Sequence, residues 1–209
     1  SGYLGSGYCG GNALPASGLG EQEIVFGGHE RLAEQLRNTA EVIDADLFVV
    51  ISGCTAEIIG DDVPSVLREY NTERGERPPA ILVSGAGFKG DSLWGYDAAL
   101  EALFRDFVRP AHKTVQRSVN VWGIPPPAQD VWWNGNLLEI RRILGRLGLE
   151  VNTFFTAHDD LGRIRDAAQA ELNVVLSPVH GVEAARVFEK VHGTPWFSTD
   201  LPIGAQATE

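Results

Sequence analysis

The chain contains two cysteines, Cys9 and Cys54, which are its strongest candidates for a metal ligand or a nucleophile. Gly53 and Cys54 follow a short apolar run, residues 47–52, so the thiol is expected in a loop where it could point into a crevice. A free cysteine is most often a small buried hydrophobe, and no Cys-x-x-Cys or paired-histidine spacing accompanies this one. If Cys54 binds a metal, its partner ligands must come from outside this sequence or from another chain.

The loop at residues 85–90 reads G-A-G-F-K-G, which fits the G-x-G-x-x-G pattern of a dinucleotide site. In such a site the third glycine already lies in the helix whose N-terminus holds the pyrophosphate. Here the amphipathic pattern begins only around Gly95, and no acidic residue ends a following strand. An NAD-dependent dehydrogenase is therefore the weaker hypothesis. The alternative is a plain glycine-rich loop that another group approaches closely.

Other polar and aromatic residues are better explained by structure than by catalysis. Asp61 and Asp62 are expected to be a loop anchor and a helix cap rather than an acid–base pair, because Pro64 suits the start of a helix. Trp132 and Trp133 are expected at a partner interface or in core packing. The histidines show no recognisable spacing to a carboxylate or cysteine and are taken as structural. They are His29, His112, His158, His180 and His192.

Strand-like and helix-like segments alternate along most of the chain. Strands are expected at residues 47–52, 80–83, 119–122, 150–155, 172–176 and 195–197, and the main helices at 29–43, 95–108, 136–147, 161–170 and 182–192, with a further helix after Asp62. This order predicts an α/β fold of Rossmann-like lobes, with parallel sheets covered by helices on both faces. Ligands of such sheets bind in the loops beyond the carboxyl ends of the strands.

A polar segment at residues 109–116 is expected to divide two lobes. Residues 1–112 would form the later part of a first Rossmann-like domain, preceded by an irregular glycine-rich segment over residues 1–28. Residues 113–209 would form a second Rossmann-like domain. The chain has no methionine and opens in a glycine-rich stretch, so we expect it to be a piece of a longer protein, with sequence missing at both ends.

Composition narrows the classes of function. Apolar residues make up 44% and charged residues 22% of the chain, which excludes wholesale disorder. A net charge of −11 argues against binding to nucleic acid or to an anionic membrane surface. No apolar run approaches the roughly 20 residues that a membrane helix needs. Two cysteines exclude a disulfide framework and favour a reducing cytoplasm.

Several motifs spread over the chain carry a family resemblance. They are Phe26-Gly27-Gly28, Cys54-x-Ala-Glu57-x-Ile59-Gly60-Asp61-Asp62, Gly87-Phe88-x-Gly90, Gly95-Tyr96-Asp97, Asn173-x-Val-Leu176-Ser177-Pro178 and Leu201-Pro-Ile-Gly204. In this order they resemble the nitrogenase component 1 family. Its members are far longer than this chain and carry Rossmann-like domains, so the resemblance implies part of the first domain and most of the second.

The resemblance implies an oxidoreductase whose paired α- and β-type subunits, expected as a heterotetramer, share an iron–sulfur cluster at their interface. The cluster would be of the [8Fe-7S] P-cluster type or a [4Fe-4S] cluster. An ATP-dependent [4Fe-4S] reductase protein would supply electrons, which pass on to a cofactor in the α-type subunit. Cys54 matches a cluster-ligating cysteine of the family, with Gly53, Gly87 and Phe88 beside the cluster, whereas Cys9 matches no family ligand clearly.

Two departures from the family pattern indicate the type of subunit. Ser177 stands where an α-type chain has its cofactor-anchoring cysteine, and a hydroxyl is a poor iron ligand, so the chain resembles the β type. Gly87 stands where molybdenum-type β subunits carry a serine near the cluster. The substrate is then dinitrogen or a thioether whose C–S bond is cleaved, as in methylthio-alkane reductases. The alternative is a cofactor-assembly scaffold of the same fold, which passes a precursor cluster on without turnover.

Overall fold

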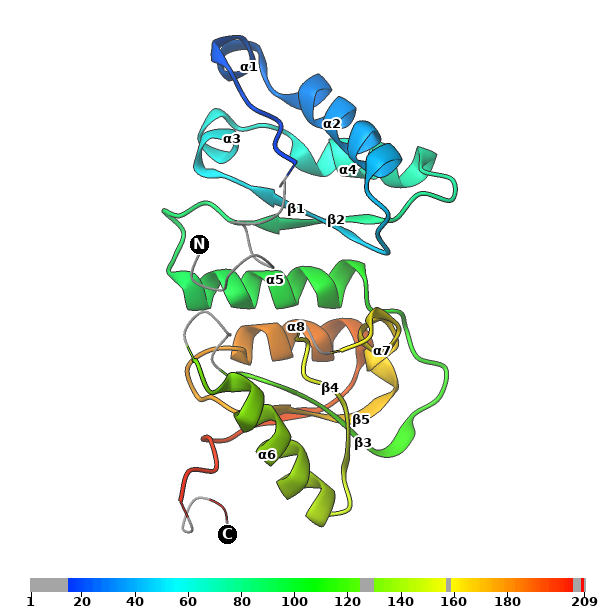
Figure 1. Cartoon of the computed structure of the whole chain (residues 1–209), viewed down its shortest axis with the longest axis vertical. Coiled ribbons are helices and arrows are strands. Elements are labelled where there is room, and N and C mark those ends of the chain that lie inside the picture. Colours follow the sequence, from blue (N-terminus) through cyan, green and yellow to red (C-terminus); the bar gives the residue numbers. More distant parts are fainter. Residues whose placement is uncertain (1–14, 125–129, 157–158, 205–207, 209) are drawn as a thin grey trace. The chain divides into compact units, whose positions relative to one another are not determined.

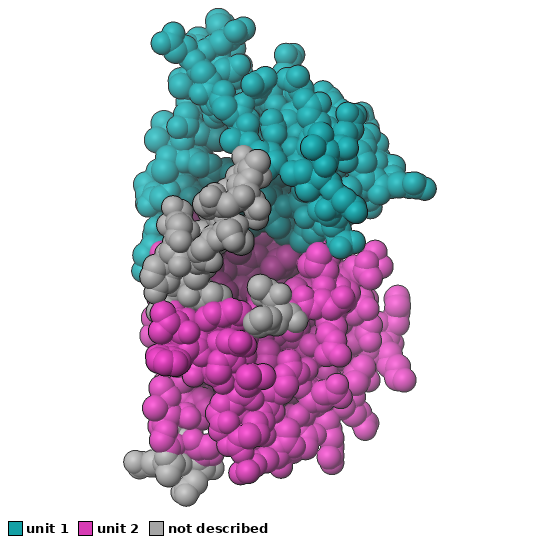
Figure 2. Space-filling view, in the orientation of Figure 1, with its two compact units in different colours: residues 1–91 teal, residues 92–209 magenta. Residues whose placement is uncertain are grey.

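The computed structural model describes residues 15–124, 130–156, 159–204 and 208. Two compact units divide at Asp91 and Ser92 (Figure 2). The sequence prediction put the boundary later, between residues 112 and 113. Residues 92–106 form a helix that packs against a helix near the C-terminus of the chain, so the structure groups them with the second unit.

The first unit is a two-stranded parallel sheet with helices on one face (Figure 1). Its elements are α1 (Glu21–Phe26), α2 (His29–Val42), β1 (Phe48–Ser52), α3 (Cys54–Ile59), α4 (Val63–Glu73) and β2 (Ala80–Ser84). The strands pair in register from Phe48 opposite Ala80 to Ser52 opposite Ser84. The carboxyl ends of β1 and β2 therefore lie side by side, and the segments that follow them share one edge of the sheet.

Alternate residues of β1 have different surroundings. Phe48 and Val50 pack with α2 and α4 around buried Leu36, Val66 and Tyr70, whereas Val49 and Ile51 are exposed. The strand at residues 47–52 is confirmed, but the prediction that it is buried on both faces is wrong for the described part of the chain. A continuous apolar run is typical of a strand buried on both faces, and β1 departs from that rule because its outward-facing residues, Val49 and Ile51, are apolar although they are exposed.

The second unit is a four-stranded parallel sheet in the order β4-β3-β5-β6. Its elements are α5 (Ser92–Asp106), β3 (Val115–Trp122), α6 (Trp133–Arg146), β4 (Glu150–Thr153), α7 (Leu161–Arg165), the 3₁₀ helix η2 (Ala167–Gln169), β5 (Ala170–Val175), α8 (Val182–His192) and β6 (Trp196–Ser198). Helices α5 and α8 lie on one face of this sheet and α6 lies on the other (Figure 1). The predicted α/β class with parallel sheets and helices is confirmed, and this second sheet is covered on both faces.

Three local predictions need correction. Residues 1–28 were expected to be irregular, but α1 forms there because the Gly20 N–H donates to the Glu23 carboxylate at 2.7 Å and caps the first turn. Helix α5 begins at Ser92, three residues before the amphipathic pattern starts. In place of the single helix expected at residues 161–170, the structure has the short helix α7 followed by the 3₁₀ helix η2.

In the part of the chain that the structure describes, no helix is long and apolar enough to cross a bilayer.

Candidate functional site

Cys54 lies where β1 ends. Gly53 is the N-cap of α3 in an extended conformation, and Cys54 is the first residue of this six-residue helix. The sequence predicted a loop here, and the structure replaces that loop by a short helix that is too brief for a periodic pattern. The Cys54 side chain is exposed and free, so the alternative of a thiol buried among aliphatic side chains is wrong.

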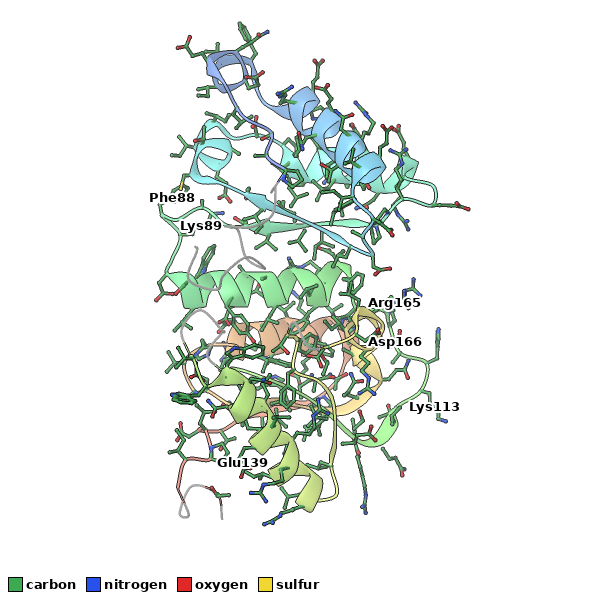
Figure 3. All side chains as sticks on the ribbon, in the orientation of Figure 1. Phe88, Lys89, Lys113, Glu139, Arg165 and Asp166 are labelled. Carbon is green, nitrogen blue, oxygen red and sulfur yellow. The ribbon has the colours of Figure 1, made fainter. Side chains whose placement is uncertain are left out.

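The loop after β2 brings Gly87 to the Cys54 sulfur. The Gly87 N–H donates to Cys54 Sγ at 3.2 Å, and a turn closed by the Lys89 N–H and the Ala86 carbonyl, 3.0 Å apart, fixes the course of the loop. Such a backbone donor stabilises negative charge on sulfur. Phe88 follows directly in the same loop, where Figure 3 labels it. Its side chain is 59% exposed. The structure thus brings together the residues that the sequence singled out: Gly53, Cys54, Gly87 and Phe88.

Gly85 explains why the two loops can approach so closely. Its N–H donates to the Ser52 carbonyl at 3.1 Å, and a β-carbon at this position would lie 2.5 Å from Ile51 Cγ2. The G-x-G-x-x-G loop is therefore the plain glycine-rich loop of the sequence alternative, and the end of β1 is the group that approaches it. Gly90 precedes α5, which begins at Ser92, so the third glycine does not lie in the helix as a dinucleotide site requires.

We expect Gly85→Ala to destabilise the first unit by about 1–3 kcal/mol, because the added methyl group overlaps Ile51 and crowds the Ser52 carbonyl. Gly87→Ala is the matched control, since its β-carbon would lie 3.8 Å from Cys54 Sγ, an ordinary contact. Urea denaturation of the two variants measures the difference. Equal midpoints would show that the close approach at Gly85 has no energetic weight.

Glu57 links the two strand ends beside Cys54. Its carboxylate accepts hydrogen bonds from Ser52 Oγ at 2.6 Å and from Ser84 Oγ at 2.5 Å, and it forms an ion pair with Lys89. Lys89 and the two hydroxyls lower the pKa of Glu57 to about 2 from its usual 4.5. A lowered pKa in the folded state contributes stability above pH 4.5, and that contribution is lost as the pH falls toward 2.

Glu57 is part of a family motif, but the sequence predicted no role for it, and it predicted none for Lys89. Glu57 lies one helical turn after Cys54, on the same short helix, which is the only signal that could have marked it. Nothing in the sequence near Lys89 points to Glu57, because the ion pair depends on how the loop folds back over the sheet edge.

The paired aspartates have the structural roles that the sequence predicted. Asp61 accepts a hydrogen bond from the Gly28 N–H at 2.8 Å, directly before α2 begins, and Asp62 caps α4 by accepting from the Ser65 N–H at 3.1 Å. A β-carbon at Gly28 would lie 2.8 Å from the Asp61 carboxylate. The Phe-Gly-Gly and Gly-Asp-Asp motifs are thus in direct contact, through the hydrogen bond between Gly28 and Asp61.

Apolar groups line a cavity that reaches Cys54 and are exposed on the neighbouring helices. Phe26 of α1 and Ile58 of α3 are large, exposed side chains on helices that contact each other. A cavity of about 370 Å³ also reaches Cys54 and is lined mainly by apolar groups, among them Leu19, Leu32 and Ile51. An exposed thiol next to exposed apolar side chains is typical of a surface that another protein covers.

Ser177 uses its hydroxyl within its own turn. Ser177 Oγ accepts from the N–H groups of Val179 and His180 at 3.1 and 3.2 Å and lies 2.9 Å from His180 Nδ1. This turn follows β5 in the second unit, next to the end of β3. The side chain is buried. The Ser177 hydroxyl therefore stabilises its own turn, and this position offers no thiolate to a metal.

The remaining residues singled out in the sequence take structural positions. His29 pairs with Glu69 at 3.4 Å on the surface, and His192 Nε2 lies 2.7 Å from the Phe104 carbonyl. Trp133 packs partly against the core beneath α6, whereas Trp132 is exposed. Cys9 and His158 lie outside the described residues. The described residues contain no group of three or more His, Cys, Asp or Glu side chains that could hold a metal ion.

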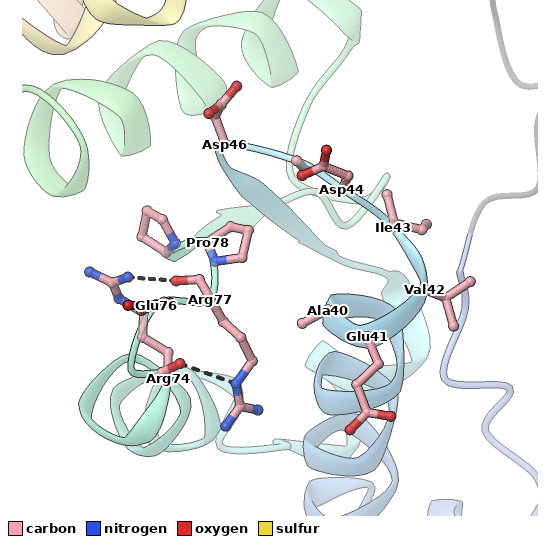
Figure 4. A pocket seen from close by; sticks show the side chains of 12 residues that line it. Ala40, Glu41, Val42, Ile43, Asp44, Asp46, Arg74, Glu76, Arg77 and Pro78 are labelled. Atoms are coloured by element: carbon pink, nitrogen blue, oxygen red, sulfur yellow. Dashed lines mark hydrogen bonds between the residues drawn. The ribbon is translucent and has the colours of Figure 1, made fainter.

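A cavity of about 560 Å³ lies at the opposite edge of the first sheet, between the end of α2 and the turn before β2 (Figure 4). Its two arginines are engaged locally, because Arg74 donates to the Arg77 carbonyl at 2.5 Å and Arg77 donates to the Arg74 carbonyl at 3.1 Å. None of the residues predicted to form a site lines it.

A sequence profile described as nitrogenase component 1 type oxidoreductase matches residues 9–209. The chain is similar to the nitrogenase molybdenum–iron protein alpha chain of Methanosarcina barkeri, with 25% identity over 95% of this chain and 36% of the relative. It is 30% identical to the iron–molybdenum cofactor biosynthesis protein NifE of the same organism, over 87% of this chain and 40% of the relative. The vanadium–iron protein beta chain of Trichormus variabilis is 23% identical, over 94% of this chain and 46% of the relative.

The solved structure "Nitrogenase Cp1 at pH 5" superposes with a TM-score of 0.69 and 26% identity, over 87% of this chain and 36% of that chain. The chain thus spans 36% to 46% of the length of these relatives. The profile covers nearly the whole sequence, and the structural similarity extends over both units. The chain belongs to the nitrogenase component 1 family of oxidoreductases.

Proposed function

We propose that this chain is part of a β-type subunit of a nitrogenase-like reductase and that Cys54 ligates an interface iron–sulfur cluster. The observation that carries the proposal is the geometry at the carboxyl ends of β1 and β2. There an exposed, free thiol accepts a hydrogen bond from a backbone N–H and is flanked by exposed apolar side chains. Thiolates are the usual ligands of iron–sulfur clusters.

The residues of this edge fit a cluster that two chains share. Cys54 supplies one thiolate, and the described residues contain no group of three or more His, Cys, Asp or Glu side chains that could hold a metal ion without outside ligands. A closed cluster needs several thiolates, so the others would come from an α-type partner subunit or from sequence outside the described residues. When bound, the cluster would relay electrons from an ATP-dependent reductase protein. This chain's residues would supply a ligand and an amide donor and exclude water.

Ser177 supports the assignment to the β type. An α-type subunit anchors its cofactor through a cysteine at this position, whereas this chain has a hydroxyl that is engaged in its own turn. In this assignment the substrate, dinitrogen or a thioether, binds in the α-type partner. The complex would be a heterotetramer in the cytoplasm, without nucleic-acid or membrane partners.

A second candidate function is a scaffold that assembles a cofactor and transfers it. It is favoured by the 30% identity to NifE, a biosynthesis protein. A scaffold and a reductase subunit share the cluster-binding edge, and they differ in what happens after the cluster binds. The scaffold releases its cluster to an acceptor, and the reductase retains it and turns over substrate.

Cys54→Ala in the full-length protein, produced with its α-type partner, tests the ligand role. We expect the variant to lose most of the iron and of the iron–sulfur absorption that the wild-type complex carries, because a methyl group cannot ligate iron. Thr55→Ala, at the next exposed position, is the control and should retain both.

Full iron content in Cys54→Ala would contradict the proposal. Assays with reductase protein and ATP then separate the two functions. Reduction of dinitrogen or a thioether supports the reductase, and cluster transfer without turnover supports the scaffold.

A further inference from the structure

The geometry points to Glu57 and Lys89 as positioning residues that hold the Gly87 amide against the Cys54 sulfur. This inference rests on the proposed function, in which that sulfur is a cluster ligand. It assigns to the ion pair a role beyond ligation, namely control of the hydrogen bond that the ligand receives.

Lys89 lies in the same loop as Gly87 and ties that loop to the helix of Cys54. Gly87 and Lys89 belong to one tight turn, so the position of the Lys89 side chain constrains the position of the Gly87 N–H. Lys89 Nζ donates to Ser84 Oγ at 2.5 Å and forms the ion pair with Glu57. The loop is thereby tied back to α3, the same helix that carries Cys54.

The ion pair is partly buried. The Glu57 side chain is only 15% exposed and that of Lys89 is 37% exposed, whereas most ion pairs among the described residues join two exposed groups. Two serine hydroxyls, from the ends of β1 and β2, complete the coordination of the carboxylate. A charge pair with several hydrogen bonds and restricted solvent access holds its geometry better than an exposed pair.

The consequence for the sulfur follows from electrostatics. A hydrogen bond to a cluster sulfur stabilises the more negative, reduced state and raises the reduction potential. Loss of the Gly87 donor lowers the potential. Loss of the positive charge of Lys89 would also lower the reduction potential. Loss of the negative charge of Glu57 would by itself raise it. Substitution of Glu57 therefore separates positioning from simple charge effects.

The first measurement needs no cluster. Hydrogen exchange at the Gly87 amide is compared in the full protein, purified without metal, between wild type, Lys89→Met and Lys89→Arg. We expect exchange to accelerate at least about fivefold in Lys89→Met, because the loop is released and the amide loses its acceptor. Lys89→Arg keeps the ion pair and should restore most of the protection. Lys113→Met, at an exposed lysine in the second unit (Figure 3), is the control and should leave the rate unchanged.

The second measurement uses the cluster-loaded complex. We expect Glu57→Ala to lower the reduction potential of the cluster although it removes a negative charge. Glu139→Ala, which breaks an exposed ion pair with Arg142, should leave it unchanged. Urea midpoints of the variants verify that each protein is folded.

Unchanged exchange at Gly87 in Lys89→Met, or a raised potential in Glu57→Ala, would overturn the inference. The exchange result does not depend on iron. It therefore decides the positioning role even if Cys54→Ala retains its iron and the proposed function fails.

Discussion

Phe104→Ala is expected to lower the free energy of unfolding of the second unit by about 3–5 kcal/mol. Phe104 is fully buried on α5, and its ring lies 5.1 Å from the ring of Trp122, 5.0 Å from that of Phe155 and 4.8 Å from that of Phe188. Truncation leaves a cavity that these large rings cannot fill without leaving their rotamers. Urea denaturation, monitored by the fluorescence of the buried Trp122, measures the loss.

Phe197→Ala is the control for the same chemical change at a partly exposed site. Phe197 on β6 is 45% exposed, so its truncation removes less buried area and should cost under about 1 kcal/mol. Similar losses in the two variants would contradict the close packing of Phe104 among the aromatic rings between α5 and the sheet.

Gly181→Ala is expected to destabilise the second unit by about 2–5 kcal/mol. Gly181 precedes α8 with a φ of +81°, and a β-carbon there would lie 2.7 Å from Trp122 Cδ1. The same residue accepts a hydrogen bond from Trp122 Nε1 at 2.8 Å and donates its N–H to the Asp97 carboxylate. The methyl group would therefore disturb the loop after β5, the end of β3 and the first turns of α5 at once.

Gly193→Ala separates backbone strain from the steric clash. Gly193 ends α8 with a φ of +74°, but a β-carbon added there would have no atom of the described residues within 4 Å. The substitution should cost only the left-handed penalty of about 1–2 kcal/mol. Thermal unfolding of both variants gives the comparison, and equal losses would show that contact with Trp122 adds nothing.

The long amphipathic segments were predictable. The structure confirms the helix at residues 182–192 with the same bounds, because Gly181 and Gly193 delimit a clear 3.6-residue pattern. The strands at residues 80–83 and 172–176 shift by only one or two residues at their ends. The bounds of these elements could be predicted from local sequence. Helix α8 buries one apolar face, and the two strands are apolar runs between charged and glycine-rich segments.

The arrangement at Cys54 was predictable only in part. The residue types and the family motif identified Cys54 and Gly87, but their hydrogen bond joins positions 33 residues apart. The same holds for Glu57 and Ser84, which are 27 residues apart. Such contacts depend on the parallel register of β1 and β2, and no local pattern encodes which residue of one loop meets which residue of the other. Helix α3 escaped prediction because six residues hold too few turns for a periodic signal.

The half-covered strand β1 has a consequence for handling the protein in solution. Among the described strands it pairs only with β2, so no described strand covers its other edge, and the side chains of Val49 and Ile51 are exposed. Natural proteins blunt such edges with lysine or proline because they template aggregation, and β1 carries neither. We therefore expect this strand to promote self-association at high concentration, and a lysine at position 49 or 51 is the natural way to protect a concentrated sample.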